Sequence, residues 1–145
     1  MKYNKFFKFL SFFGTPYFYI ILFLILIFFN SPLTIKLVTG ILITEAICWM
    51  IKIIYKKQRP KPRKIKNFYQ KLDANSFPSI HTARIALIVA TTNILFFDYL
   101  LFLLSISLLI GVGFSRIYLK EHYLIDVITG GIIGLIIGSI IGGLI

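Results

Sequence analysis

Five long apolar runs restrict this chain more than any other feature of its sequence. They cover residues 9–29, 33–54, 79–95, 99–114 and 123–145, and each meets or approaches the roughly 20 residues that a helix needs to cross a bilayer. Hydrophobic residues make up 58% of the chain and charged residues only 14%, which is well to the apolar side of a soluble domain. The sequence therefore predicts an all-α, polytopic transmembrane helical bundle of about five spans.

The segment between the second and third runs differs in kind from the rest of the chain. Residues 55–77 carry many cations and two prolines with no apolar run, so we expect an aqueous or interfacial loop. No other stretch could build a separate soluble domain, and residues 1–145 are therefore predicted to form a single membrane-embedded domain. Three lysines precede the first run, which we interpret as a retained signal anchor because it is too long for a typical signal peptide.

Positive charge is concentrated on one side of the predicted bundle. Sixteen Lys and Arg face five Asp and Glu, and most of these cations fall in the N-terminal segment, the 55–77 loop and the turn at 116–120. By the positive-inside rule this side is cytoplasmic in a multi-pass protein of the cell membrane. Nucleic acid is excluded as a partner because no soluble fold presents the charge, whereas anionic lipid of the bilayer is a natural partner.

Polar residues that could do chemistry form three clusters at the ends of the runs. Counting crossings places all three clusters at the same membrane face, where we expect the active site. The clusters are Lys52 with Arg59, then Pro78-Ser79-Ile80-His81, and finally Ser115-Arg116 with His122 and Asp126.

The third cluster contains a candidate nucleophile. Asp126 follows His122 by four positions, so on a helix the two side chains share a face and the carboxylate can accept a hydrogen bond from imidazole Nδ1. This interaction would fix the tautomer and leave Nε2 able to attack phosphorus. His81, the only other histidine, is then the candidate general acid that protonates the departing alkoxide.

The cations of the clusters suit a phosphoryl group. Phosphoryl transfer spreads negative charge over three equatorial oxygens, and Lys52, Arg59 and Arg116 can supply the donors that stabilise it. Ser79 opens the third predicted helix, where backbone N–H groups and the helix dipole also favour an anion. A metal hydrolase is the competing interpretation of the His-x-x-x-Asp pair, with His81 as third ligand, but two ligands are too few on their own.

Taken in order, the three clusters resemble the signature of the type 2 phosphatidic acid phosphatase (PAP2) superfamily, which also includes vanadium haloperoxidases and polyprenyl diphosphate phosphatases. The resemblance covers the chain from Lys52 to Asp126. It implies a phosphohistidine intermediate on His122, leaving-group protonation by His81, and neither metal nor cofactor. The chain departs from the family pattern at Ile80, where the pattern PSGH has glycine.

The principal hypothesis is an integral-membrane lipid phosphatase that hydrolyses a phosphomonoester or diphosphate, such as phosphatidic acid, phosphatidylglycerol phosphate or a polyprenyl diphosphate. An alternative is a weakened relative that binds or translocates an anionic phospholipid without turnover. Ile80 favours this alternative, because a β-branched residue restricts the backbone and crowds the phosphate. A third hypothesis is a structural or pore-forming bundle.

Other residues within the spans are predicted to have structural roles. Glu45 and Arg84 are ionisable residues inside apolar runs, and we expect them to pair. Glycines at a spacing of four in the last run predict close packing against a neighbouring helix or, in a homo-oligomer, against a second copy. We expect the remaining loop cations to contact headgroups or solvent; they are Lys56, Lys57, Lys61, Arg63, Lys64 and Lys66.

Overall fold

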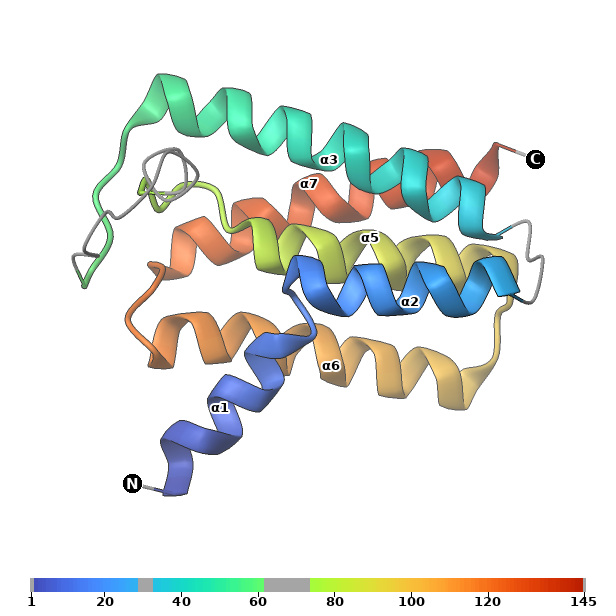
Figure 1. Cartoon of the computed structure of the whole chain (residues 1–145), viewed down its shortest axis with the longest axis horizontal. Helices are drawn as coiled ribbons and strands as arrows, with labels where there is room; N and C mark the ends of the chain where they lie inside the picture. Colours follow the sequence, from blue (N-terminus) through green and yellow to red (C-terminus); the bar gives the residue numbers. More distant parts are fainter. Residues whose placement is uncertain (1, 29–32, 62–73, 145) are drawn as a thin grey trace.

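The computed structural model describes residues 2–28, 33–61 and 74–144, and within these ranges it is entirely helical apart from turns and loops. Five helices run side by side along the long axis, and α1 is turned away from them (Figure 1). The helices are α1 (Lys2–Phe12), α2 (Pro16–Phe28), α3 (Leu33–Tyr55), α5 (Ile80–Leu95), α6 (Tyr99–Tyr118) and α7 (Leu124–Gly143).

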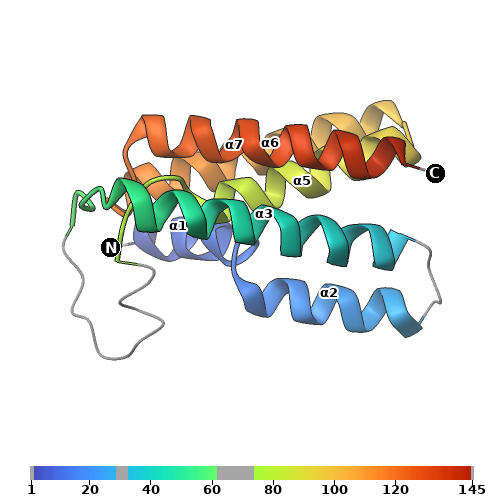
Figure 2. The ribbon, with the colours of Figure 1, turned by 90° about the horizontal axis from the view of Figure 1, so that it is seen from above.

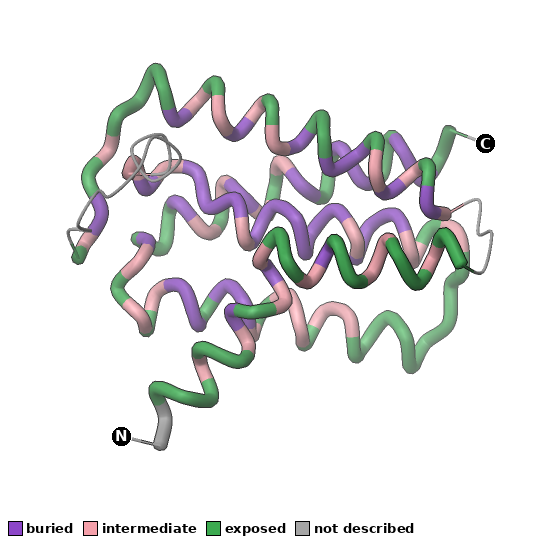
Figure 3. The backbone as a smooth tube through the Cα atoms, in the orientation of Figure 1, coloured by how far each residue is buried: buried purple, intermediate pink, exposed green. Residues whose placement is uncertain are grey.

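Three helices of the described ranges, α3, α6 and α7, are long and apolar enough to cross a membrane, and the bent pair α1–α2 makes a possible fourth span. Helix α5 has only 16 residues and is the most enclosed element (Figure 3). The all-α membrane bundle predicted from the sequence is therefore confirmed. The count differs from five full spans because α5 is a short core helix and the first run is broken.

The first apolar run forms two helices where one was predicted. Helix α1 ends at Phe12, helix α2 begins at Pro16, and their axes meet at 46°. Proline suits the first position of a new helix because it has no N–H to donate to a preceding turn. The break also brings Gly14 against His81 of α5, where a Cβ on Gly14 would lie 2.7 Å from the Cβ of His81. Only glycine fits this approach.

The glycine face of α7 packs on α5 of the same chain. A Cβ at Gly134 would lie 2.0 Å from the carbonyl oxygen of Ala83, and one at Gly138 would lie 2.5 Å from that of Leu87. The absence of side chains therefore permits backbone-to-backbone packing. The predicted packing against a neighbouring helix is confirmed. Because α5 occupies the glycine face of α7, a second copy of the chain cannot pack on that face. A homo-oligomer would need another surface.

Four helix ends meet at one end of the bundle. The C-terminal ends of α3 and α6 lie there with the N-terminal ends of α5 and α7, and the views in Figures 1 and 2 agree on this arrangement. The predicted polar clusters stand at these four ends, so the fold gathers them as the crossing count required. Residues 62–73, with Arg63, Lys64 and Lys66, lie outside the described residues.

Candidate active site

The imidazole of His122 is buried in the turn between α6 and α7, with 2% of the residue exposed. Its Nε2 lies 3.4 Å from Nη1 of Arg59. Its Nδ1 lies 3.8 Å from Oδ2 of Asp126, so the carboxylate is near but beyond hydrogen-bonding distance. The turn is held by the backbone, because the amides of Glu121 and His122 both donate to the carbonyl of Arg116.

Asp126 is fully buried and stands in the first turn of α7. Oδ1 accepts a hydrogen bond from Nζ of Lys57 at 2.7 Å, and Oδ2 accepts one from the backbone N–H of Tyr123 at 2.9 Å. The assignment of Lys57 to headgroups or solvent is therefore wrong. Lys57 belongs to the site, and the neighbouring run of lysines concealed it in the sequence.

Burial lowers the pKa of His122 from 6.5 to about 4. The buried imidazole loses the solvation that its protonated form needs, and Asp126 opposes this effect only in part. The cations Arg116, Arg59 and Lys52 lower the pKa further by repelling a second positive charge. His122 is therefore neutral at physiological pH, which is the protonation state that a nucleophilic imidazole requires.

Two arginines from separate elements converge on one carboxylate. Nη1 of Arg59 donates to Oε2 of Glu121 at 2.9 Å, and Nη2 of Arg116 lies 3.9 Å from the same oxygen. Arg116 also donates to Oγ of Ser11 in α1 at 2.6 Å. Both arginines are almost completely buried. The carboxylate of Glu121 thus lies between the two guanidinium groups that were predicted to bind phosphate, and the sequence gave no sign of this contact.

Lys52 is fully buried at the end of α3, where its ammonium group donates to the carbonyl of Asn75. The amide of Asn75 donates in return to the carbonyl of Lys52 at 2.8 Å. Ser76 adds a second link, since its N–H donates to the carbonyl of Lys57 and its hydroxyl to that of Gln58. These bonds hold the segment before α5 against the end of α3, close to His122.

Ser79 and Ile80 open α5, and both are buried. The N–H of Ser79 donates to the carbonyl of Asp126, and its hydroxyl lies 3.0 Å from that of Thr82. The side chain of Ile80 packs in an apolar cluster with Cys48 and Ala83, and its φ angle is negative. Ile80 thus has an ordinary backbone conformation with its side chain in the core, and its effect on a bound phosphate stays a prediction.

His81 and Arg84 connect the site to the break between α1 and α2. His81 lies in the first turn of α5 and contacts Gly14, and Nη1 of Arg84 donates to the carbonyl of Gly14 at 2.8 Å. Nη2 of Arg84 lies 2.7 Å from Oε1 of Glu45. The ion pair predicted between the second and third runs is confirmed.

The arrangement combines a neutral buried imidazole with cations from three elements. Such a site can position a tetrahedral oxyanion beside Nε2 of His122 and stabilise the charge that develops on its oxygens. Among the described residues, no three His, Cys, Asp or Glu side chains come together as a metal-binding group would require. The side chains that do come together are an imidazole, a carboxylate and several cations.

Comparison with known proteins agrees with this geometry. The profile of the PAP2 superfamily matches residues 33–142. A search of curated protein sequences finds no match. Among solved structures, the crystal structure of Aquifex aeolicus LpxE is 23% identical, with a TM-score of 0.78 over 95% of this chain and 84% of that one. A transmembrane PAP2 type phosphatidylglycerolphosphate phosphatase from Bacillus subtilis is 18% identical, with a TM-score of 0.79 over 97% of this chain and 75% of that one. The match extends over most of the chain, which therefore belongs to the PAP2 superfamily.

Proposed function

We propose that this protein hydrolyses a phosphate ester of a membrane lipid through a phosphohistidine on His122. The observation that carries the proposal is the gathering of buried cations around a neutral imidazole whose Nε2 lies 3.4 Å from Arg59. A phosphoryl group beside these cations would accept hydrogen bonds from them and present its phosphorus to His122.

The proposed reaction has two steps. Nε2 of His122 attacks phosphorus, the P–O bond to the lipid breaks, and His81 gives a proton to the departing alkoxide. A water molecule then attacks phosphorus while His81 takes up its proton, the P–N bond to His122 breaks, and inorganic phosphate leaves. Lys52, Arg59 and Arg116 hold the equatorial oxygens in both steps, with the N-terminus of α5 at Ser79 beside them.

An apolar groove beside the site supports a lipid substrate. It has a volume of about 320 Å³ and lies between α6 and α7, with Gly113, Gly131 and Thr82 among its lining residues. Thr82 contacts Ser79 through its hydroxyl group, so the groove adjoins the predicted phosphate site. We propose that the hydrocarbon chain of the substrate lies in this groove while its phosphate reaches His122.

The groove can be tested by filling it. A Cβ at Gly131 would lie 3.9 Å from Cγ2 of Thr82, so a larger side chain projects into the groove without a backbone clash. The substitution Gly131→Leu is expected to lower kcat/KM for a long-chain lipid phosphate about fivefold, but to leave hydrolysis of the short soluble ester p-nitrophenyl phosphate within twofold. Equal losses on both esters would contradict the assignment.

The names of the structural neighbours agree with a lipid substrate, since one of them is described as a phosphatidylglycerolphosphate phosphatase. Phosphatidic acid, phosphatidylglycerol phosphate and polyprenyl diphosphates all fit a site with a membrane-facing groove. Ile80 was the feature that favoured a binder or translocator without turnover, and because its side chain packs with Cys48 and Ala83 we prefer the phosphatase. The glycine face of α7, which suggested a pore-forming bundle, packs on α5 of the same chain.

The decisive experiment is release of inorganic phosphate by the detergent-solubilised protein from a panel of lipid phosphates. Vanadate, a phosphate analogue, is expected to block the release and a chelator to leave it unchanged. The variant His122→Ala is expected to lose at least about 10³-fold in rate, because it removes the nucleophile. Equal rates for wild type and His122→Ala would rule out the catalytic assignment, and vanadate-sensitive binding without release would establish the alternative.

We further propose that the site faces the cytoplasm. The basic segments at 2–8, 52–61 and 116–120 stand at the same end of the bundle as His122, whereas Lys36 caps the opposite end, where it donates to the carbonyl of Gly142. The variant Lys61→Cys in a Cys48→Ala background should react with an impermeant thiol reagent only after the cells are opened. Labelling of intact cells would contradict this orientation.

A further inference from the structure

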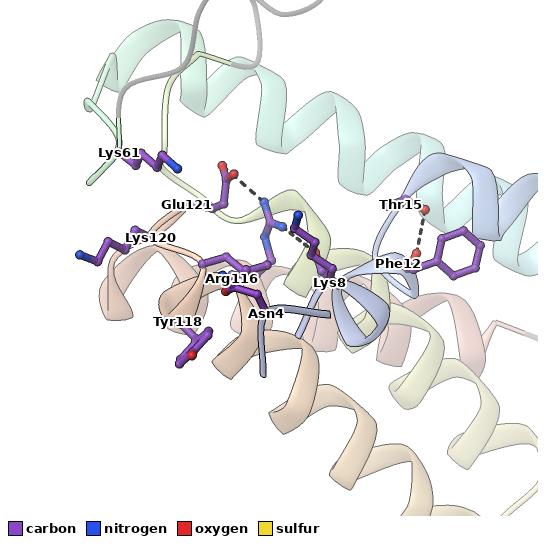
Figure 4. Close-up of a pocket in the computed structure, with 11 residues that line it drawn as sticks. Asn4, Lys8, Phe12, Thr15, Lys61, Arg116, Tyr118, Lys120 and Glu121 are labelled. Atoms are coloured by element: carbon purple, nitrogen blue, oxygen red, sulfur yellow. Dashed lines mark hydrogen bonds and ion pairs between the residues drawn. The ribbon is translucent and has the colours of Figure 1, made fainter. Parts of the chain in front are cut away.

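A second cavity adjoins the candidate active site on the side of α1. It has a volume of about 580 Å³, which is within the range of small-molecule sites and larger than a single phosphate needs. Its walls come from α1, from the segment after Arg59 and from the end of α6 (Figure 4). None of its lining residues has a role in the reaction proposed above except Arg116, which borders both sites.

The cavity is strongly positive. Lys8, Lys61, Lys120 and Arg116 line it, and among its lining residues that the structure describes Glu121 is the one carboxylate. The side chains of Lys8 and Lys61 point toward the Arg116–Glu121 pair, whereas that of Lys120 points away (Figure 4). Cations from separate elements that converge on one cavity repel one another unless an anion lies between them.

The walls of the cavity are held in place by hydrogen bonds. Arg116 donates to Oγ of Ser11, which fixes α1 against the end of α6. The N–H of Lys61 donates to the carbonyl of Lys120 at 3.1 Å, which fixes the segment after Arg59 against the turn that carries His122. Lys120 itself has φ of 57°, a left-handed conformation that a non-glycine residue adopts at some cost. Hydrogen bonds therefore hold the backbone that carries Lys8, Lys61 and Lys120 in place.

We propose that this cavity binds a second anionic group of the substrate, in the polar part of the lipid between the scissile phosphate and the acyl chains. The proposal rests on the phosphatase function proposed above and narrows its substrate class. Arg116 touches both anions, and Lys8 and Lys61 contact the second one. The preferred substrate is then a lipid whose polar part carries two anionic groups joined by a short spacer, because a lipid with one phosphomonoester leaves the cavity empty.

The test compares two lipids with the same acyl chains. Dioleoyl phosphatidic acid carries the phosphomonoester alone, and dioleoyl phosphatidylglycerol phosphate carries it together with a phosphodiester. The kcat/KM for phosphatidylglycerol phosphate divided by that for phosphatidic acid is expected to fall about tenfold in Lys8→Gln and in Lys61→Gln. Each substitution removes one charge-assisted contact to the second anion. Lys5→Gln is the matched control, because Lys5 lies on α1 but outside the cavity, and its ratio is expected to equal that of the wild type.

The possible outcomes separate this inference from the function on which it rests. A ratio that is unchanged in Lys8→Gln and Lys61→Gln, while both lipids are still hydrolysed, would overturn the second anion site alone. If neither lipid is hydrolysed by the wild type, the phosphatase function itself fails. If the two variants weaken inhibition by added inorganic phosphate but keep the wild-type ratio, the cavity binds free phosphate, and the proposal for the lipid is overturned.

Discussion

Two buried arginines of this bundle stand in opposite situations. Arg84 lies among the helices with its guanidinium 2.7 Å from Glu45, and it donates to the carbonyl of Gly14, so its charge is balanced within the protein. Arg116 lies at the end of the bundle in a group that also contains Lys52, Lys57 and Arg59.

Two carboxylates of the described residues, Glu121 and Asp126, form ion pairs with members of this group of four cations. The comparison shows that a buried arginine stabilises the fold where its charge is balanced, as it is at Arg84. Where several cations gather, the arginine is suited to bind a further anionic group.

The largest expected effect is on catalysis, at the end of the bundle that holds Arg116. Arg116→Met removes a cation that holds the equatorial oxygens, and we expect kcat/KM for phosphate release to fall about 10²–10³-fold. Its melting temperature in detergent should change little, because the lost hydrogen bond to Ser11 is offset by the relief of repulsion among the cations. A clear loss of stability with little loss of activity would place Arg116 in the structural class with Arg84.

At the ion pair of Arg84 and Glu45 we expect the opposite result, a loss of stability rather than of activity. Arg84→Met leaves Glu45 and the carbonyl of Gly14 without their partner, and we expect the free energy of unfolding to fall by about 3 kcal/mol, the lower end of the range for a broken buried pair because Glu45 is partly exposed. The double variant Glu45→Gln, Arg84→Met is the control and should recover part of the loss. Denaturation in detergent measures both. A stable Arg84→Met variant with reduced activity would contradict the distinction.

The excess of cations should also be visible in the titration of His122. With a pKa of about 4, well below 6.5, the imidazole remains neutral down to about pH 5 and gains a proton only as the pH falls through 4. Activity that depends on the neutral form is therefore retained at pH 6 and lost only as the pH falls through about 4. Histidine-selective NMR in detergent measures the pKa directly, because His81→Gln leaves a single imidazole. Lys52→Met should raise this pKa, and a value near 6.5 in the wild type would contradict the burial and the charge excess.

A smaller effect is expected at the carboxylate between the two arginines. Glu121 occupies the position where a phosphate oxygen would accept from Arg59 and Arg116, so the substrate must compete with it. Glu121→Gln is expected to tighten inhibition by vanadate about threefold. Asp98→Asn neutralises a carboxylate at the opposite end of α6 and keeps a helix cap, so its inhibition constant should not change. Weaker inhibition in Glu121→Gln would show that the carboxylate positions Arg59 rather than competing with substrate.

The sequence was sufficient to predict where the site would form. Helix parity carries Lys52, Ser79, Arg116 and His122 to one end of a bundle whatever the details of packing. The spacing of His122 and Asp126 predicted a shared helical face, but His122 precedes α7, and its Nδ1 lies 3.8 Å from Oδ2 of Asp126. The pair Glu45 and Arg84 was equally predictable, because ionisable groups within apolar helices must find each other.

The contacts that the sequence did not reveal depend on loop and turn geometry. Lys57 reaches Asp126 only because the chain turns sharply after α3, where Lys56 has φ of 40°. Glu121 meets both arginines because the turn after α6 folds back on the carbonyl of Arg116. The break between α1 and α2 places Gly14 against His81, and His81 lies on a helix far along the chain. No local pattern encodes such contacts.

The most direct test of the central claim, that the cations gather around His122 to present phosphorus to it, is to trap the covalent intermediate. The protein is mixed with a lipid phosphate that carries a radiolabelled phosphoryl group, quenched in denaturant and separated from lipid. The account predicts label on the wild-type chain that is stable to base and labile to acid, as expected for phosphohistidine, and no label on His122→Ala. Label that persists on His122→Ala, or turnover by that variant at the wild-type rate, would contradict it.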